Sequence, residues 1–199
     1  MVSSEGWQRS VALHGHACCL LAVGYRAAET ALAELKRLGM DLPDLAAVVE
    51  NRTCGVDGVQ AVCQATLGNG RLLILDRGKY VFTVGSPRAR KGVRISLLPG
   101  ILSQPGPEFV TLMEKVANAE ATEGERSRFY ELQEPLTQYI LEADSRELFD
   151  IAVVDFSFSR PRLSLFTVRC GECGEEVAQA CAIRQGESWL CESCQESQK

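Results

Sequence analysis

The segment HGHACC, residues 14–19, brings together side chains that bind metals or act as nucleophiles. It holds both histidines of the chain and two of its nine cysteines. Imidazole and thiolate ligands together suit transition metals such as zinc. A second interpretation is a reactive thiol, because Cys18 at a helix start would be stabilised as thiolate by exposed backbone N–H groups. A third places the cysteines in the core as small apolar groups and both histidines in a surface loop.

A metal held by this segment would need ligands from another part of the chain. Cys54 and Cys63 flank the start and the middle of the next expected helix, so they are the natural candidates. The residues alone leave the choice between them, and between metal and thiol chemistry, open.

A second cluster of cysteines lies near the C-terminus. Cys170 and Cys173 are two residues apart, and after 17 residues Cys191 and Cys194 repeat that spacing. Two thiolates at this spacing reach one ion from a tight turn, and two such pairs complete a tetrahedron. Free surface thiols or a redox-active pair are the alternatives, but the second pair favours a closed, structural zinc site. Cys181, between the pairs, is expected to pack inside the module.

The cysteine-rich tail is too short to fold by apolar burial alone. About 30 residues bury too little surface, so the metal would supply the folding free energy. We expect a short hairpin between the cysteine pairs. The predicted organisation is a core domain over residues 1–158, followed by a linker and zinc finger over residues 159–199.

Helices are predicted at both parts of the core that carry the reactive residues. Apolar residues recur at helical spacing from Cys18 to Leu38, and Gly39 is placed to end that helix. HGHACC therefore lies at its start. Asp57 and Gln60 resemble a capping box that opens a second helix, with Cys54 just before it.

The remaining elements predict a mixed α+β domain. Strands are expected at 46–50, at 71–75 and 80–84 joined by a short turn, at 93–97 and at 151–158, and helices at 106–119 and 123–149. Because strands and helices do not alternate regularly, the fold class is α+β rather than α/β.

Composition and charge exclude several classes of protein. Hydrophobic residues make up 46% of the chain, which supports a packed core. No apolar run is long enough to span a bilayer, and no leader pattern precedes the first helix, so we expect a cytoplasmic protein with reduced thiols. The net charge is −5, and the tail from residue 170 holds six glutamates against two basic residues. This acidic tail argues against nucleic-acid binding.

Basic residues are concentrated in residues 71–94. Seven lysines and arginines stand there against one aspartate. They form either a solvated surface or an anion-binding edge for a phosphorylated or carboxylated ligand. Lys79 is the residue best placed to contact such a ligand.

Two motifs in the core resemble the FmdE family, named for the E subunit of formylmethanofuran dehydrogenase. The family's His-Gly-His-x-Cys and Gly-x-Arg correspond to residues 14–18 and 24–26. Its second motif corresponds to CGVDGVQ at 54–60, followed by Thr66, Gly68 and the Gly78-Lys79 turn. This chain departs from the family at Cys19-Leu20, where relatives have Pro-Gly, and at Ala65, where relatives have a cysteine.

The resemblance implies a core site and a partner. The site would contain His16, Cys18 and Cys54 near Asp57 and would hold a second transition metal besides the tail zinc. Some relatives also end in a treble-clef zinc finger. The family name implies a protein partner related to a molybdenum or tungsten dehydrogenase, and the zinc finger would contact that partner or a second copy in a homodimer.

Three functions compete at this point. The first is a metal-binding accessory or interaction protein. The second is a metal- or thiol-dependent enzyme acting on a small anionic substrate, with Cys18, Asp57 and Lys79 as candidate catalytic residues. The third, a DNA-binding regulator, is disfavoured by the acidic tail.

Overall fold

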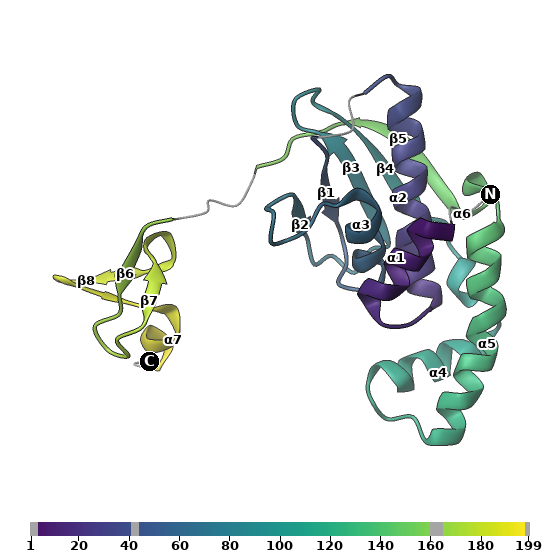
Figure 1. The fold of residues 1–199 in the computed structure, drawn as a ribbon. Coiled ribbons are helices and arrows are strands. Elements are labelled where there is room, and N and C mark those ends of the chain that lie inside the picture. The colour runs from purple at the N-terminus through teal and green to yellow at the C-terminus, as the bar shows by residue number, and fades with distance from the viewer. Residues whose placement is uncertain (1–3, 41–43, 160–164, 198–199) are drawn as a thin grey trace. The chain divides into compact units, whose positions relative to one another are not determined.

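The structure is a computed structural model that describes residues 4–40, 44–159 and 165–197. The chain divides into two units, residues 1–158 and 159–199, and each is described by itself. The link predicted over 157–169 lies partly outside the described residues. Figure 1 shows the elements of both units.

The first unit contains a five-stranded mixed sheet with the strand order β2-β1-β3-β4-β5. The strands are β1 Ala46–Val49, β2 Leu72–Ile74, β3 Val81–Ser86, β4 Lys91–Leu97 and β5 Phe149–Asp155. Strand β1 pairs with β2 in parallel and with β3 antiparallel, and the other neighbours are antiparallel. The sequence-based expectation that β2 and β3 form a simple pair across a short turn is therefore wrong, because β1 lies between them.

One helix, α2, lies between the sheet and the other helices (Figure 1). The helices of this unit are α1 Ser4–His14, α2 Cys19–Arg37, α3 Gly55–Cys63, η1 Ile101–Ser103, α4 Pro107–Ala117, α5 Glu123–Glu142 and α6 Ser145–Leu148. Helix α2 contacts β3 and β4 on one side and α1, α3 and α5 on the others. Its small and apolar residues are buried around most of its circumference, and Gly39 follows it with a φ of +69°. The predicted helix over residues 18–38 is confirmed.

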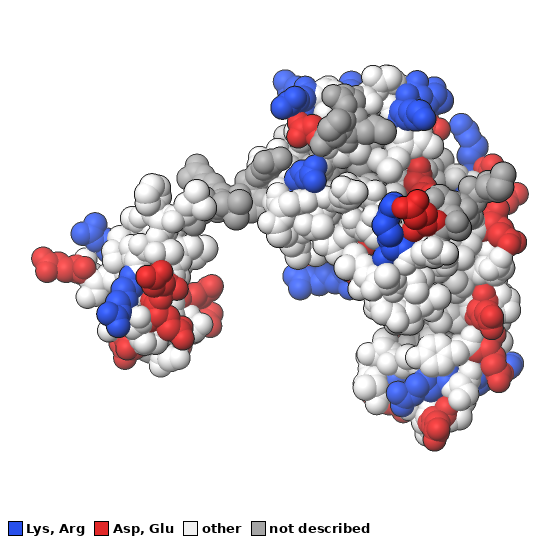
Figure 2. Space-filling view, in the orientation of Figure 1, with Lys and Arg blue, Asp and Glu red and all other residues white. Residues whose placement is uncertain are grey.

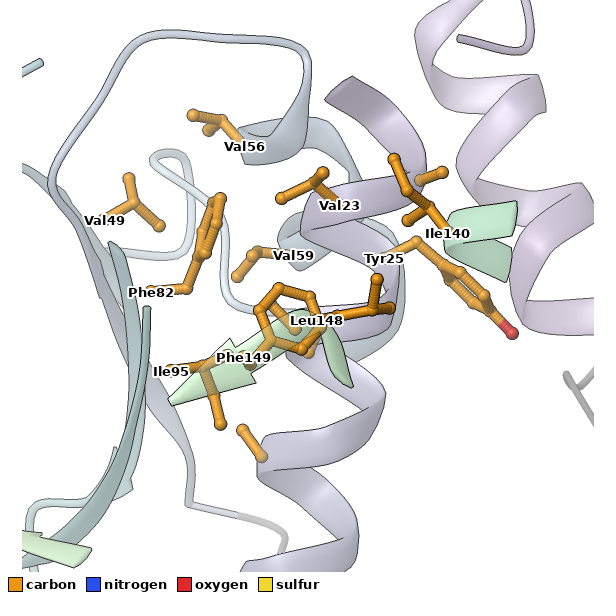
Figure 3. Close-up of a cluster of buried hydrophobic side chains, with 14 of the residues drawn as sticks. Val23, Tyr25, Val49, Val56, Val59, Phe82, Ile95, Ile140, Leu148 and Phe149 are labelled. Atoms are coloured by element: carbon orange, nitrogen blue, oxygen red, sulfur yellow. The ribbon is translucent and has the colours of Figure 1, made fainter. Parts of the chain in front are cut away.

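The core of the unit fills the space between α2, α3, α5 and the sheet. Phe82 and Ile95 from the sheet meet Val23 and Tyr25 from α2 and Val59 from α3, and all five are fully buried (Figure 3). Burying large side chains of this kind contributes about 1.5–3 kcal/mol each. This cluster fixes both helices on the sheet.

Helices α2 and α3 touch through their backbones. A Cβ atom added to Gly24 would lie 1.9 Å from the carbonyl oxygen of Gly55, and one added to Gly58 would lie 2.4 Å from the backbone nitrogen of Tyr25. No side chain fits into either contact. The glycines therefore set the distance between the helices that carry Cys18 and Cys54.

Arg26 of α2 closes the C-terminal end of α5. Its guanidinium donates to the carbonyl oxygens of Ile140, Leu141 and Ala143 at 2.9, 2.5 and 2.8 Å, and the residue is only 9% exposed. These carbonyls have no partner within a helix that ends here. Arg26 thus satisfies groups that would otherwise be costly to bury.

The long helix predicted over residues 123–149 is wrong in its C-terminal part. Ala143 is extended, and the Asp144 side chain accepts from the backbone nitrogen of Arg146 at 2.8 Å. This cap starts the short helix α6, and the chain then enters β5 at Phe149. Pro135 lies inside α5.

The second unit contains two small hairpin-like sheets and a short helix. Its elements are β6 Thr167–Arg169, β7 Glu176–Ala178, η2 Gln179–Cys181, β8 Ile183–Gln185, β9 Ser188–Leu190 and α7 Glu192–Glu196. Strand β6 pairs with β7, and β8 pairs with β9 across a turn at Gly186. The hairpin expected between the cysteine pairs is present as β8 and β9. A cysteine turn, a hairpin and a terminal helix form the expected treble-clef-like arrangement.

None of the helices in the described parts of the chain combines the length and apolar character needed to cross a bilayer.

The helix contact makes a direct prediction. Replacing Gly24 with Ala places a methyl group inside the backbone of Gly55, which cannot move aside as a side chain would. We expect a loss of about 3 kcal/mol or more in the free energy of unfolding, measured by urea titration of the full chain.

Gly124 in the exposed first turn of α5 is the matched control. An added Cβ there meets nothing within 4 Å. Gly124→Ala should stabilise the protein by about 0.5–1 kcal/mol, because alanine loses less backbone entropy in a helix. Equal stability of the two variants would contradict the backbone contact.

Candidate metal centres

The HGHACC segment forms the turn between α1 and α2. Helix α1 ends at His14, Gly15 takes a φ of +96°, and Cys18 caps the start of α2 by accepting from the backbone nitrogen of Leu21 at 3.3 Å. One ligand atom each from His14, His16 and Cys18 lies within 4.8 Å of the others. The glycine turn therefore folds two imidazoles back toward the thiol at the helix start.

His14 is oriented by a carboxylate from α3. Its Nδ1 lies 2.8 Å from Oδ2 of Asp57, and its Nε2 lies 3.8 Å from Sγ of Cys18. Because a carboxylate only accepts, Nδ1 carries the proton and Nε2 presents its lone pair. This is the arrangement that carboxylates impose on metal-binding histidines.

Asp57 does not cap its helix as the sequence predicted. Helix α3 starts two residues earlier, with Cys54 at the cap position. The Asp57 side chain instead bonds to His14, and its other oxygen accepts from Gln60 at 3.1 Å. The capping-box expectation is wrong because a partner 43 residues away takes the carboxylate.

Cys54 and Cys18 form a hydrogen-bonded thiol pair. The hydrogen bond from Cys18 and the nearby His14 outweigh burial and lower the pKa of Cys54 to about 6. Pairing with Cys54 and burial raise the pKa of Cys18 well above its usual range, despite the Leu21 hydrogen bond. The thiolate expected at Cys18 is therefore carried by Cys54.

Two other cysteines of the core point elsewhere. Cys19 donates to Oε1 of Gln133 on α5 at 3.6 Å, and burial first raises its pKa to about 12. Cys63 is buried at the end of α3, and burial raises its pKa to about 12 as well. Both residues belong to the hydrophobic core. They therefore do not replace the family cysteine that is Ala65 here.

Lys79 is fixed through its main chain rather than its side chain. Its backbone nitrogen donates to the carbonyl of Glu50 at 2.9 Å, and its carbonyl accepts from the buried Asn51 side chain at 2.9 Å. The side chain is exposed. The structure thus gathers His16, Cys18, Cys54 and Asp57 but does not bring the Lys79 amine into that group.

His14 is the residue that the predicted ligand set omitted. The sequence signal was present, since His14 stands four residues before Cys18 and belongs to the same motif as His16. What the sequence could not show is the contact with Asp57, which singles out His14 over its neighbour. The two rings lie 4.6 Å apart between centroids.

The four tail cysteines form a compact cluster. One ligand atom from each of Cys170, Cys173, Cys191 and Cys194 lies within 4.8 Å of the rest, and the sulfurs of Cys173 and Cys191 are 3.9 Å apart. A tetrahedral zinc with bonds of about 2.3 Å would separate its sulfurs by about 3.8 Å. The cluster therefore fits a zinc ion without rearrangement.

Backbone amides prepare this cluster for a cation. Hydrogen bonds from the backbone of Cys191, Cys173 and Glu172 lower the pKa of Cys170 to about 6. The first turn closes through Gly174, which takes a φ of +76° and donates to the Cys170 carbonyl at 3.0 Å. Cys181 is exposed on η2, outside the cluster, so the expectation that it packs inside the module is wrong.

A family model described as "FmdE, Molybdenum formylmethanofuran dehydrogenase operon" matches residues 13–150. The chain belongs to the FmdE family. The match covers most of the first unit, including both motifs that carry the core cluster. It confirms the resemblance seen in the sequence.

Two known proteins extend the comparison for this FmdE chain. A probable S-adenosyl-L-methionine-binding protein from Archaeoglobus fulgidus is 31% identical over 198 residues, which is 94% of this chain but only 51% of that protein. The chain thus spans about half the length of this relative. A crystal structure of a tungsten formylmethanofuran dehydrogenase FmdE-like protein from Syntrophus aciditrophicus matches with a TM-score of 0.63 and 23% identity. The match covers 99% of this chain and 96% of that one, and shows that the fold is shared.

The structure gives the FmdE motif residues physical roles. Gly24 permits the backbone contact with α3, and Arg26 closes α5. Leu20, in place of the family glycine, packs against the core without displacing Cys18 from the helix cap. Ala65 is fully buried beyond the end of α3. These departures leave the cluster of His14, His16 and Cys18 assembled.

The thiol pair predicts different pH profiles for its members. In metal-free protein, Cys54 should react with iodoacetamide with a midpoint near pH 6, because its thiolate is already stabilised there. Reactivity is present above that pH and is lost as pH falls through it. Cys18 should stay unreactive to strongly alkaline pH, and peptide mass spectrometry distinguishes the sites.

The tail cluster predicts a loss of metal on mutation. Replacing Cys170 and Cys191 with Ser should remove one zinc equivalent per chain and unfold the tail, because the metal supplies its folding free energy. Inductively coupled plasma mass spectrometry measures the content, with Cys181→Ser as the matched control. Undiminished zinc in the double variant would contradict the assignment.

Proposed function

We propose that this chain is a metal-binding accessory protein with two centres of different kinds. The tail cysteines hold a structural zinc ion, and the core holds a second transition-metal ion through His14, His16 and Cys18. The observation that carries the core assignment is the Asp57–His14 hydrogen bond of 2.8 Å. It leaves the Nε2 lone pair of His14 on the side of Cys18, where a metal ligand needs it.

The donor set favours zinc in the core as well. Imidazole nitrogen and thiolate sulfur are the usual zinc donors in proteins. Cys54 lies beside Cys18 and His14, and its lowered pKa supplies a thiolate as fourth ligand. The open side of the site is formed by the exposed His16. When bound, the ion would supply a Lewis acid at this position.

An accessory role is supported by the family and by the charge of the tail. The family model is described by a dehydrogenase operon, and the similar crystal structure is of an FmdE-like protein of a tungsten dehydrogenase. We therefore infer a protein partner related to a molybdenum or tungsten dehydrogenase, in the cytoplasm, with a homodimer as the assembly of this chain. Figure 2 shows acidic side chains gathered on the second unit, which disfavours nucleic acid as its partner.

A metal- or thiol-dependent enzyme is the second candidate. The observation that favours it is the thiolate of Cys54, which is only partly buried beside the imidazole of His14. Such a pair can act as a nucleophile or as ligands to a reactive metal. Replacing Cys54 with Ala would abolish either activity. The same change would leave an accessory role that depends only on the tail and the surface.

Metal content tests the core assignment. Purified protein should contain about two metal equivalents, and His14→Ala should contain about one. Asp57→Asn should weaken binding of the core metal by about 10–100-fold, since it loses the charge that orients His14. Competition with a chelator measures the affinity, and Cys181→Ser serves as control. One equivalent in the unmodified protein would contradict the core site.

A further inference from the structure

A groove of about 350 Å³ lies beside the core cluster. In Figure 1, helix α4 and the adjoining end of α5 extend beyond the sheet, and the groove lies between α4 and the ends of β3 and β4. Six residues give it its character: Tyr80, Leu97, Leu98, Leu102, Val110 and Met113.

The lining of the groove carries no charge. Apart from the hydroxyls of Tyr80 and Ser103, its side chains are apolar. Its volume is at the low end of the range for small-molecule sites, about 300–1,000 Å³. An ionised ligand would lose its hydration here without gaining a partner. The occupant that fits is therefore a small, uncharged organic molecule.

Tyr80 links the groove to the cysteines of the core. It lines the groove, and burial, followed by the charges of Cys19 and Cys54, raises the pKa of its phenol. Electrostatic contact of this kind requires the phenol to lie near both thiols. The hydroxyl therefore stays protonated and can donate a hydrogen bond at the boundary between groove and cluster.

Backbone contacts hold this boundary in place. The Asn51 side chain is 2% exposed and donates to the carbonyl of Lys79, the residue before Tyr80, at 2.9 Å. Its oxygen accepts from the backbone and hydroxyl of Thr53, at 3.2 and 2.8 Å, just before Cys54. One buried amide thus joins the segment that carries Tyr80 to the segment that carries Cys54.

We propose that the groove binds the apolar body of a small, uncharged organic ligand and presents its polar end past Tyr80 to the His14, Cys18 and Cys54 site. The inference rests on the proposed core site as the group that receives the ligand. It replaces the small anionic substrate expected from the sequence, because Lys79 and the other basic residues of segment 71–94 do not line this groove.

Binding of a neutral fluorophore tests the groove. N-phenyl-1-naphthylamine should bind the full chain saturably, and Val110→Trp should weaken binding by at least about tenfold by filling the groove. Val153→Trp is the matched control, because Val153 is 49% exposed on the edge strand β5 and outside the groove. The sulfonated analogue 1-anilinonaphthalene-8-sulfonate should bind more weakly. Absence of saturable binding, or equal binding by the Val110 and control variants, would overturn the proposal.

Thiol labelling tests the connection between groove and cluster. N-phenylmaleimide should modify Cys54 at least about tenfold faster, relative to Cys181, than a carboxyethyl maleimide does, and Val110→Trp should remove that preference. Met113→Glu provides a second variant, which places a charge in the groove if the tryptophan variant fails to fold. Equal relative rates for the two reagents would refute the connection.

Metal analysis of the same samples separates this proposal from the proposed function. Val110→Trp should keep the metal content of the unmodified protein. If the unmodified protein lacks the core metal but binds the fluorophore in the groove, the metal assignment fails and the groove stands. If the metal is present and the fluorophore does not bind, the groove proposal alone fails.

Discussion

The backbone contact between α2 and α3 determines the geometry of the core site. Gly55 follows Cys54 directly, and it lies against Gly24, less than two turns beyond Cys18. Side chains at the contact would separate the helices by more than the reach of a thiol hydrogen bond. The sheet and α5 fix α2 from its other sides, so that only the glycines let α3 approach. The site therefore depends on side chains that are absent at two positions more than on any bond within it.

The two centres differ in how far the sequence alone could predict them. All four tail ligands stand within 25 residues, so local spacing was sufficient to predict that cluster. Helical periodicity also predicted α2 correctly. The core site needed long-range information: Asp57 reads as a helix cap until His14 is seen beside it. The insertion of β1 between β2 and β3, and the choice of Cys54 over Cys18 as thiolate, likewise depend on contacts that no local pattern records.

A bound ion could also do different things at the two centres. Four cysteines enclose the tail ion, which leaves no position for another ligand. The core site combines three residues from one turn with a thiolate from a second helix, and one of its histidines is exposed. A groove without charge adjoins it through Tyr80. The same chain thus joins an ion that only holds structure to a site with access for a neutral molecule.

Arg26 has a consequence for how the chain folds during synthesis. Its carbonyl partners on α5 follow it by more than 110 residues. Until that part of the chain leaves the ribosome, the guanidinium cannot be buried without losing its hydration. Helix α2 must therefore stay accessible to water on this side while the strands it covers are being made. The first unit can close only after α5 has emerged, which makes it a single late-folding body rather than one that assembles in step with translation.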